Sequence, residues 1–291
     1  MDKTKKRDNR VPRHQFDNID FSKIYSFSKL ETFDKCKKQY HFSYLDPEIS
    51  PRKKEFIKPR DYKTKGQAVH GALTLFYHLP EKERSPERLK NFLFEAWYAE
   101  GDPTKAPPLA ESGGFKDIKH ERKIYEHSLV LLKNFLKRKD FYPKIYYLPT
   151  KNIRYSFDDY KEMIKPISDD YSISGKFDRI DSLKNGNLRI IDFKTGKNEK
   201  DSFQLEFYKL LAEMNFNINV DTVSFYYLDS AKIVNYDFSN YSNEKTKDIL
   251  LNKINEIQST KDFYPQKSAL CSHCDFMEIC PLFAKDAKLK I

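Results

Sequence analysis

The sequence predicts an α/β fold in which a mixed central sheet is flanked by helices. Short apolar runs rich in β-branched and aromatic residues alternate with longer segments of helical periodicity in the second half of the chain. Their order, with several strands, a helix, two strands and a helix, is typical of such a sheet. The expected strands span residues 145–147, 153–157, 173–180, 188–193, 222–228 and 233–238, and the expected helices of this part span 202–215 and 244–259.

The chain is expected to begin with a basic, flexible tail over residues 1–20, followed by a helix. The tail is polar and rich in lysine and arginine. Ser28 is the predicted N-cap of the helix, because Glu31 three residues later completes a capping-box pattern. We expect this helix to carry Cys36 and to end near residue 44.

Two further helical regions are expected before the strands. A helix over residues 66–79 carries His70 on an apolar face. Residues 81–143 then predict a helical insertion, because Ser85-Pro86 is a helix start signal and apolar residues at helical spacing follow later.

One predicted strand ends with an acid and an amine two residues apart, Asp192 and Lys194. Successive side chains of a strand point to opposite faces, so these two point to the same side of the sheet. The spacing alone is compatible with an ion pair on a solvated face as well as with a catalytic site.

A neighbouring strand brings a second carboxylate. Asn185-Gly186 lies between the runs that contain Asp178 and Asp192, and Asn-Gly between alternating apolar runs predicts a β-hairpin. The hairpin would place Asp178 close to Asp192. Asp181 falls on the opposite face by its spacing and is expected to be exposed to solvent.

The two carboxylates predict a metal site. At about 4–6 Å they repel each other, and one takes up a proton unless a cation lies between them. Mg²⁺ or Mn²⁺ suits two carboxylates with several retained waters. Beside such an ion, Lys194 could orient an activated water or neutralise charge on a phosphorane-like transition state.

The four cysteines form an uneven set in which Cys271, Cys274 and Cys280 follow a C-x2-C-x5-C pattern and Cys36 lies far earlier. Since the sequence has no secretory signal and no run of about 18 apolar residues, we expect a cytoplasmic, reducing location and no disulfide framework. Four thiolates there predict a metal centre rather than unrelated thiols. Their spacing leaves zinc and an iron–sulfur cluster open.

The composition favours a polyanionic partner and no membrane. Lys and Arg number 53 against 43 Asp and Glu, which gives a formal net charge of +10. This balance is typical of nucleic-acid binding, although a solvated lysine-rich surface would look similar. Some of the aromatic residues could stack on unpaired bases, but most are expected in the core.

Four motifs occur in the order found in the RecB-like branch of the PD-(D/E)XK nucleases, which the sequence resembles over most of its length. They are Gly66-x-x-x-His70, Gly175-x-x-Asp178-Arg179, Asp192-x-Lys194 and Gln204-x-x-x-Tyr208. One such motif occurs by chance in many proteins, whereas four in order are specific. The resemblance implies a single nuclease domain over residues 21–291 with a restriction-endonuclease-like catalytic core at 144–260.

The resemblance also implies roles for individual residues. The implied metal ligands are the side chains of His70, Asp178 and Asp192 and the backbone carbonyl of Phe193. Lys194 would be the catalytic lysine, and Gln204 and Tyr208 would line the site. From the residues alone, His70 could be a core histidine, and the last two, at i and i+4, a surface hydrogen-bonded pair.

One N-terminal cysteine followed by C-x2-C-x5-C resembles the iron–sulfur subset of this family, found in AddB-type nuclease subunits and CRISPR-associated exonucleases. The resemblance implies a [4Fe–4S] cluster that acts as a clasp between the N- and C-terminal regions, with residues 261–291 pairing with Cys36. Zinc is the alternative. A crosslink of so long a loop would stabilise the fold by restricting the unfolded chain.

The expected function is that of a metal-dependent deoxyribonuclease, an exonuclease on single-stranded or frayed DNA ends, in DNA repair or CRISPR adaptation. Two alternatives stay open. One is a catalytically silent DNA-binding or scaffolding subunit that partners a helicase or a CRISPR adaptation protein. The other is a zinc-stabilised module that recognises RNA or protein.

Overall fold

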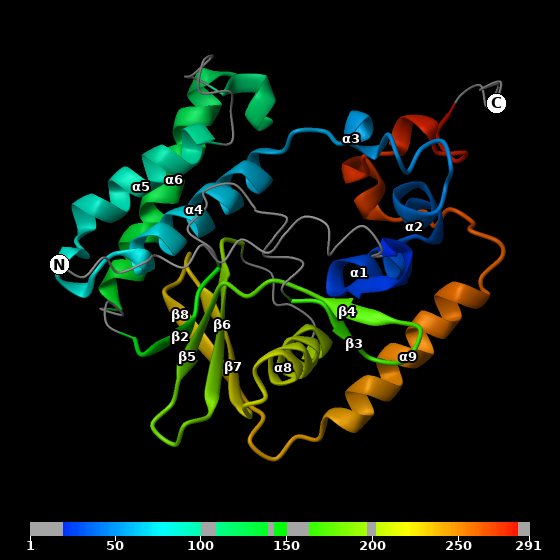
Figure 1. Ribbon diagram of the computed structural model, residues 1–291. Coiled ribbons are helices and arrows are strands. Elements are labelled where there is room, and N and C mark those ends of the chain that lie inside the picture. Colours follow the sequence, from blue (N-terminus) through cyan, green and yellow to red (C-terminus); the bar gives the residue numbers. More distant parts are fainter. Residues whose placement is uncertain (1–19, 100–108, 139–142, 150–162, 197–201, 285–291) are drawn as a thin grey trace, which may run out of the picture.

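The computed structural model describes residues 20–99, 109–138, 143–149, 163–196 and 202–284. The expected strand at 153–157 and the basic tail up to residue 19 lie outside this part of the chain. A five-stranded mixed sheet forms the centre, with helices on both faces and a three-stranded sheet at one side (Figure 1). The predicted α/β class is therefore confirmed.

The five-stranded sheet has the order β2-β5-β6-β7-β8. These strands are β2 (Ile145–Tyr147), β5 (Arg179–Ser182), β6 (Leu188–Lys194), β7 (Val220–Tyr227) and β8 (Lys232–Asp237). β6 and β7 are parallel, and the other neighbouring pairs are antiparallel. The predicted hairpin is present as β5 and β6, with Ile180 opposite Ile190 and Arg179 opposite Ile191. Asp178 comes just before β5, and continuing this register places it opposite Asp192, near the C-terminal end of β6.

The single strand expected at 173–180 is wrong. The chain forms β4 (Ser172–Ser174) in the three-stranded sheet, leaves strand geometry, and then enters β5 in the larger sheet. Gly175 lies at the crossing, where an added Cβ would come within 2.9 Å of the Leu211 side chain. The smaller sheet has the order β1-β4-β3, and its partners β1 (Ile24–Ser26) and β3 (Lys165–Pro166) are too short to show alternation in sequence.

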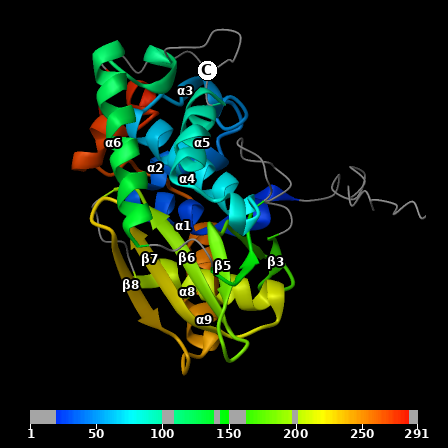
Figure 2. The same cartoon turned by 90° about the vertical axis from the view of Figure 1, so that its left-hand side faces the viewer.

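The helices form two layers because the two faces of the strands carry separate hydrophobic cores (Figures 1 and 2). Ile190 and Phe225 belong to the core with α8 (Ser202–Phe216) and α9 (Asn243–Ser259). Ile191 and Phe193 belong to the opposite core. That core is covered by α4 (Asp61–His78), α5 (Pro86–Ala99) and α6 (Ile118–Lys137). The segment predicted as a helical insertion thus contributes α5 and α6 to this layer, and α4 precedes it.

The N-terminal helix differs from the prediction in its start and its continuity. Its N-cap is Ser26, whose hydroxyl accepts a hydrogen bond from the Lys29 N–H at 3.2 Å, and the predicted cap Ser28 lies inside the first turn. The chain forms two helices, α1 (Phe27–Lys35) and α2 (Lys37–Tyr44), separated by an extended residue, Cys36. A helical pattern of side chains does not reveal such a break, because it changes the backbone at one residue only.

The C-terminal segment folds back onto the N-terminal region (Figure 1). It contains two 3₁₀ turns, Ala269–His273 and Met277–Ile279, beside α2 and the short α3 (Lys53–Phe56). Arg60 donates a hydrogen bond to the His273 carbonyl at 3.0 Å, and the Lys58 ammonium lies 2.6 Å from a Glu278 carboxylate oxygen. Three further 3₁₀ turns are Phe21–Lys23, Glu81–Glu83 and Ala110–Gly113.

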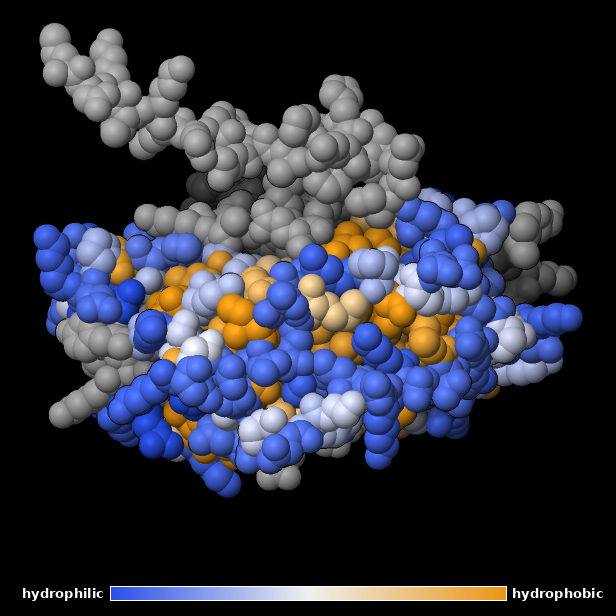
Figure 3. Space-filling model, turned by 60° about the horizontal axis from the view of Figure 1, so that its bottom comes forward, coloured by the Kyte–Doolittle hydropathy of each residue, from blue (hydrophilic) through white to orange (hydrophobic). Residues whose placement is uncertain are grey.

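The surface is polar over much of its area. Figure 3 shows one face on which hydrophilic residues predominate and hydrophobic residues lie in smaller groups between them. Among the helices of the described residues, none has the length and apolar character needed to cross a membrane.

Candidate active site

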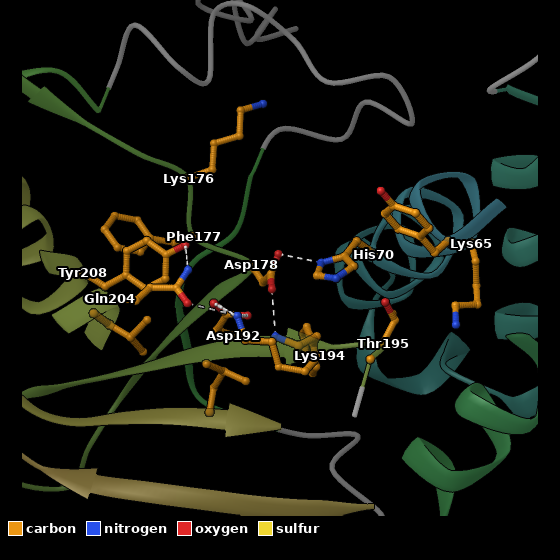
Figure 4. A pocket seen from close by; sticks show the side chains of 15 residues that line it. Lys65, His70, Lys176, Phe177, Asp178, Asp192, Lys194, Thr195, Gln204 and Tyr208 are labelled. Carbon is orange, nitrogen blue, oxygen red and sulfur yellow. Dashed lines mark hydrogen bonds and ion pairs between the residues drawn. The ribbon is translucent and has the colours of Figure 1, made fainter. Parts of the chain in front are cut away.

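The predicted site residues meet in one open cavity at the C-terminal end of β6, between α4 and α8 (Figure 4). The cavity has a volume of about 630 Å³. The predicted residues that line it are His70, Asp178, Asp192, Phe193, Lys194, Gln204 and Tyr208. They come from four separate elements, so only the tertiary fold brings them together.

β6 delivers Asp192 and Lys194 to the same face, as its alternation predicts. The Lys194 ammonium lies 2.8 Å from each oxygen of the Asp192 carboxylate and 4.5 Å from the centre of the Phe225 ring. Burial raises the pKa of Asp192 above its ordinary value, and the nearby Lys194 charge opposes this only in part. Asp192 is buried and the Lys194 side chain is only 11% exposed, so the pair differs from an ion pair on a solvated face.

Asp178 is held by two donors at the entry to β5. Its Oδ1 lies 2.8 Å from His70 Nδ1, and its Oδ2 accepts a hydrogen bond from the Phe193 N–H at 2.8 Å. Burial raises the pKa of the Asp178 carboxyl, but His70 and the Phe193 N–H outweigh this and leave it below its ordinary value. Burial lowers the pKa of His70, whereas Asp178 raises it further, so the net pKa is above the ordinary value. The charged forms of both partners are therefore favoured.

His70 faces the cavity and is not enclosed in the core. Its α4 neighbours Ala68, Val69 and Ala72 are buried, while the His70 side chain is 23% exposed. The helix comes close to the end of β6, because a Cβ on Gly66 would lie 3.5 Å from Thr195 Oγ1. The spacing from Gly66 to His70 is one helical turn, so this approach also places the imidazole near the carboxylates.

Gln204 and Tyr208 lie on one face of α8, as their spacing predicts. The Gln204 amide donates to the Tyr208 hydroxyl at 3.0 Å, and its carbonyl accepts a hydrogen bond from the Lys194 ammonium at 3.5 Å. Gln204 is buried. The two residues are therefore part of the cavity wall and not a surface pair.

The expected exposure of Asp181 is wrong. Asp181 does point to the opposite face from Asp178, but there the α4 layer covers it and leaves it 7% exposed. Arg179 donates to its carboxylate at 2.9 Å and lies over the Tyr77 ring at 4.6 Å. Spacing along the strand identified the face correctly, whereas the burial of that face depends on a helix about a hundred residues away.

The residue types of the cavity, two carboxylates and an imidazole, are ones that divalent metal ions accept as ligands. In the structure, His70 Nδ1 and Asp178 Oδ1 are paired with each other at 2.8 Å. The carboxylate of Asp192 is turned to Lys194 instead. In the part of the chain that the structure describes, no group of three or more His, Cys, Asp or Glu side chains, here or elsewhere, has the arrangement of a metal site.

The four cysteines line a second cavity of about 180 Å³, where the C-terminal segment meets α1 and α2. All four are free thiols. Gln266 donates a backbone hydrogen bond to Cys36 Sγ at 3.4 Å, and Ser268 donates one to Cys271 Sγ at 3.3 Å. Burial raises the pKa of the Cys274 thiol. Although all four thiols line this cavity, no three of them have the arrangement of a metal site, so a thiolate-bound centre, zinc or iron–sulfur, stays a prediction.

Four residues with polar side chains that line the cavity were not predicted as site residues: Tyr62, Lys65, Lys176 and Thr195. Lys65 directly precedes Gly66, and Thr195 directly follows Lys194, so adjacency to a motif was the available signal. Lysine is abundant in this chain, and so no lysine stands out by type alone.

Comparison with known proteins adds three findings. The model of the PD-(D/E)XK nuclease superfamily matches residues 24–281. The "Gene 69 protein" of Mycobacterium phage L5 is 24% identical over an alignment of 291 residues that covers 89% of this chain and 96% of the phage protein. Among solved structures, "Crystal structure of SSO0001" matches 93% of this chain and 91% of that chain at 14% identity, with a TM-score of 0.38, which is too low to establish a common fold.

Proposed function

Because the chain belongs to the PD-(D/E)XK nuclease superfamily, we propose that it is a metal-dependent deoxyribonuclease, an exonuclease on single-stranded or frayed DNA ends. One observation carries the proposal. Two carboxylates, an imidazole and an ammonium from three separate elements converge on one open cavity. A site of this composition can hold a cation and a phosphodiester together.

The residues that would hold Mg²⁺ or Mn²⁺ are Asp178, Asp192 and His70, together with the Phe193 carbonyl. The Phe193 N–H already bonds to Asp178, and the N–H and C=O of one strand residue point to the same edge. When bound, the ion would supply electrophilic activation of the phosphate and acidify the attacking water.

Lys194 would provide a positive charge beside the phosphate that is cut. Its ammonium is held by Asp192, by the Gln204 carbonyl and over the Phe225 ring, so its position is defined before substrate binds. Preorganised charge of this kind stabilises the developing negative charge of a transition state. Tyr208 orients Gln204 through their hydrogen bond and in this way supports the lysine.

We propose a second, structural role for the cysteine cavity, that of binding a [4Fe–4S] cluster that joins Cys36 to residues 261–284. The cavity contacts both chain regions, and two sulfur atoms accept backbone N–H donors. Anaerobic purification tests this proposal, because an iron–sulfur protein is coloured. A colourless protein that contains stoichiometric zinc would contradict it.

The nuclease proposal is tested by digestion of end-labelled single-stranded and duplex DNA with Mg²⁺ and Mn²⁺. The wild-type protein should shorten the strand from an end, and Lys194→Ala should not, although it should still bind DNA. Lys247→Ala, which removes an exposed lysine on α9, is the matched control and should digest normally. A wild-type protein that binds DNA without cutting it would favour the silent subunit, the role in which a helicase or CRISPR adaptation protein is the expected partner.

A further inference from the structure

Tyr62 and Lys65 form one wall of the active-site cavity, and neither residue belongs to any of the four motifs. Both lie on α4 and line the cavity together with His70. Since they are three residues apart on a helix, they share one face. Figure 4 shows Lys65 on the opposite side of the carboxylates from Gln204 and Tyr208, so the cavity has two distinct walls.

Unlike His70 and Lys194, Lys65 is not paired with an acid among the described residues. His70 pairs with Asp178 and Lys194 pairs with Asp192, each at 2.8 Å. For the Lys65 ammonium, no hydrogen bond or ion pair joins it to any residue of the described ranges. Burial lowers its pKa, and the charges of two more distant acids, Asp61 and Asp229, offset this only in part. An anion in the cavity would therefore be stabilised beside Lys65.

Tyr62 places an accessible aromatic ring beside this cation. Its side chain is large and the residue is 48% exposed, although it lines the cavity. A cation next to an accessible ring is how proteins grip single strands, with the phosphate on the cation and a base stacked on the ring. In a duplex the bases are stacked on one another, so such a ring is used only by unpaired nucleotides.

We propose that Lys65 and Tyr62 are the strand-binding edge of the site: Lys65 binds a backbone phosphate next to the one that is cut, and Tyr62 stacks on an unpaired base. The substrate class is then single-stranded DNA or a frayed end. This inference rests on the proposed function, because it takes the cavity to be the place where the strand lies. Both residues bind and position the substrate and take no part in the chemical step.

Binding of DNA without turnover tests the phosphate contact. Fluorescence anisotropy with a labelled single-stranded oligonucleotide, without Mg²⁺ or Mn²⁺, gives the affinity as a function of salt concentration. Losing one phosphate contact reduces the slope of log affinity against log salt by about 0.7. Lys65→Gln should show this reduction, Lys65→Arg should keep the wild-type slope, and Lys247→Gln on α9 should change nothing. A wild-type slope in Lys65→Gln would overturn the assignment.

The same assay tests the stacking contact. Tyr62→Ala should weaken single-strand binding by about 5- to 150-fold, as expected for the loss of one base–aromatic stack, and Tyr62→Phe should retain it. Affinity for a blunt duplex should hardly change in either variant. Equal losses on single strand and duplex, or no loss on either, would overturn the role of Tyr62.

The two proposals can fail separately. If the wild-type protein cuts DNA but the Lys65 and Tyr62 variants bind as the wild type does, only the strand-binding edge is wrong. If the wild-type protein never cuts DNA but the variants lose affinity as described, the nuclease proposal is wrong and the edge still describes a single-strand binding site.

Discussion

The cavity at the end of β6 and the cavity that contains the four thiols differ in what surrounds them. Around the first, Ile190, Ile191 and Phe193 are each at most 3% exposed, and helices cover both faces of the strand. Around the second, Phe276 is the only buried residue in the described segment 261–284, which forms 3₁₀ turns, other turns and irregular chain.

This difference indicates where each site obtains its rigidity. Hydrophobic packing of the sheet holds the carboxylates and Lys194 whether or not a metal is bound. The described C-terminal segment has one buried residue, Phe276, so we expect a centre bound to its cysteines to add more to its order than a metal adds at the first cavity. Loss of a ligand should thus affect activity at the first cavity and stability at the second.

The largest effect is expected for Asp192→Asn, which keeps the shape of the side chain and removes its charge. Cleavage of end-labelled DNA with Mg²⁺ should fall by more than about a thousand-fold, because a cation ligand and the partner of Lys194 are lost together. The thermal midpoint should fall as well, because Lys194 loses its buried partner, but the protein should stay folded, since the surrounding core is intact. Asp248→Asn, at an exposed position of α9, is the control and should behave as the wild type. Substantial residual cleavage by Asp192→Asn would show that activity does not depend on the Asp192 charge.

Cys36→Ala should lower stability directly and activity only indirectly, whereas Asp192→Asn acts on activity directly. Loss of a link across so long a loop costs about 2–5 kcal/mol, which lowers the thermal midpoint by about 5–15 °C. The visible absorbance of the centre should weaken, and activity should fall only indirectly, as the termini loosen. Calorimetry and absorbance of anaerobically purified protein measure both. Unchanged stability and activity would show that the centre does not hold the chain ends.

A pH titration tests whether Lys29 anchors the N-terminal segment independently of a centre at the cysteines. Lys29 is buried, donates to the carbonyls of Ser22 and Ile24 at 2.9 Å each, and has its pKa lowered to about 8, mainly by burial. Between about pH 8 and the higher pKa of the unfolded chain, the unfolded state binds more protons, so the free energy of unfolding should rise with pH.

The expected rise is on the order of 1–3 kcal/mol by the same linkage. Lys29→Met, which fills similar space without a charge, should remove it. Urea unfolding of both proteins from pH 7.5 to 10.5 measures the difference. Parallel pH profiles for the two proteins would exclude Lys29 as the cause.

The smallest effect is expected for Tyr208→Phe, which removes the hydroxyl that accepts a hydrogen bond from the Gln204 amide. The loss of one such bond, about 1 kcal/mol, should lower kcat about 5-fold through a less well held Lys194. KM for the DNA strand should stay nearly constant. An effect on KM alone would show instead that Tyr208 contacts the substrate.

Local chemistry in the sequence was sufficient to predict the strand hairpin and about half of the candidate active site. Asn185-Gly186 defined the turn, and the two-residue period placed Asp192 and Lys194 on one face, next to Asp178. These features depend on neighbouring residues and on backbone geometry that every strand shares. The motif order then indicated His70, which the structure brings to 2.8 Å from Asp178.

What only the tertiary structure decided has a common physical origin. The burial of Asp181 depends on α4, the break of the strand at Gly175 depends on its approach to α8, and the unmatched charge of Lys65 depends on which acids come near it. By itself, the sequence determined which faces and turns the chain can form. Which of those faces is covered, and which charge is left to meet a ligand, depended on packing between segments far apart in the chain, because burial is a property of the assembled layers and not of the strand itself.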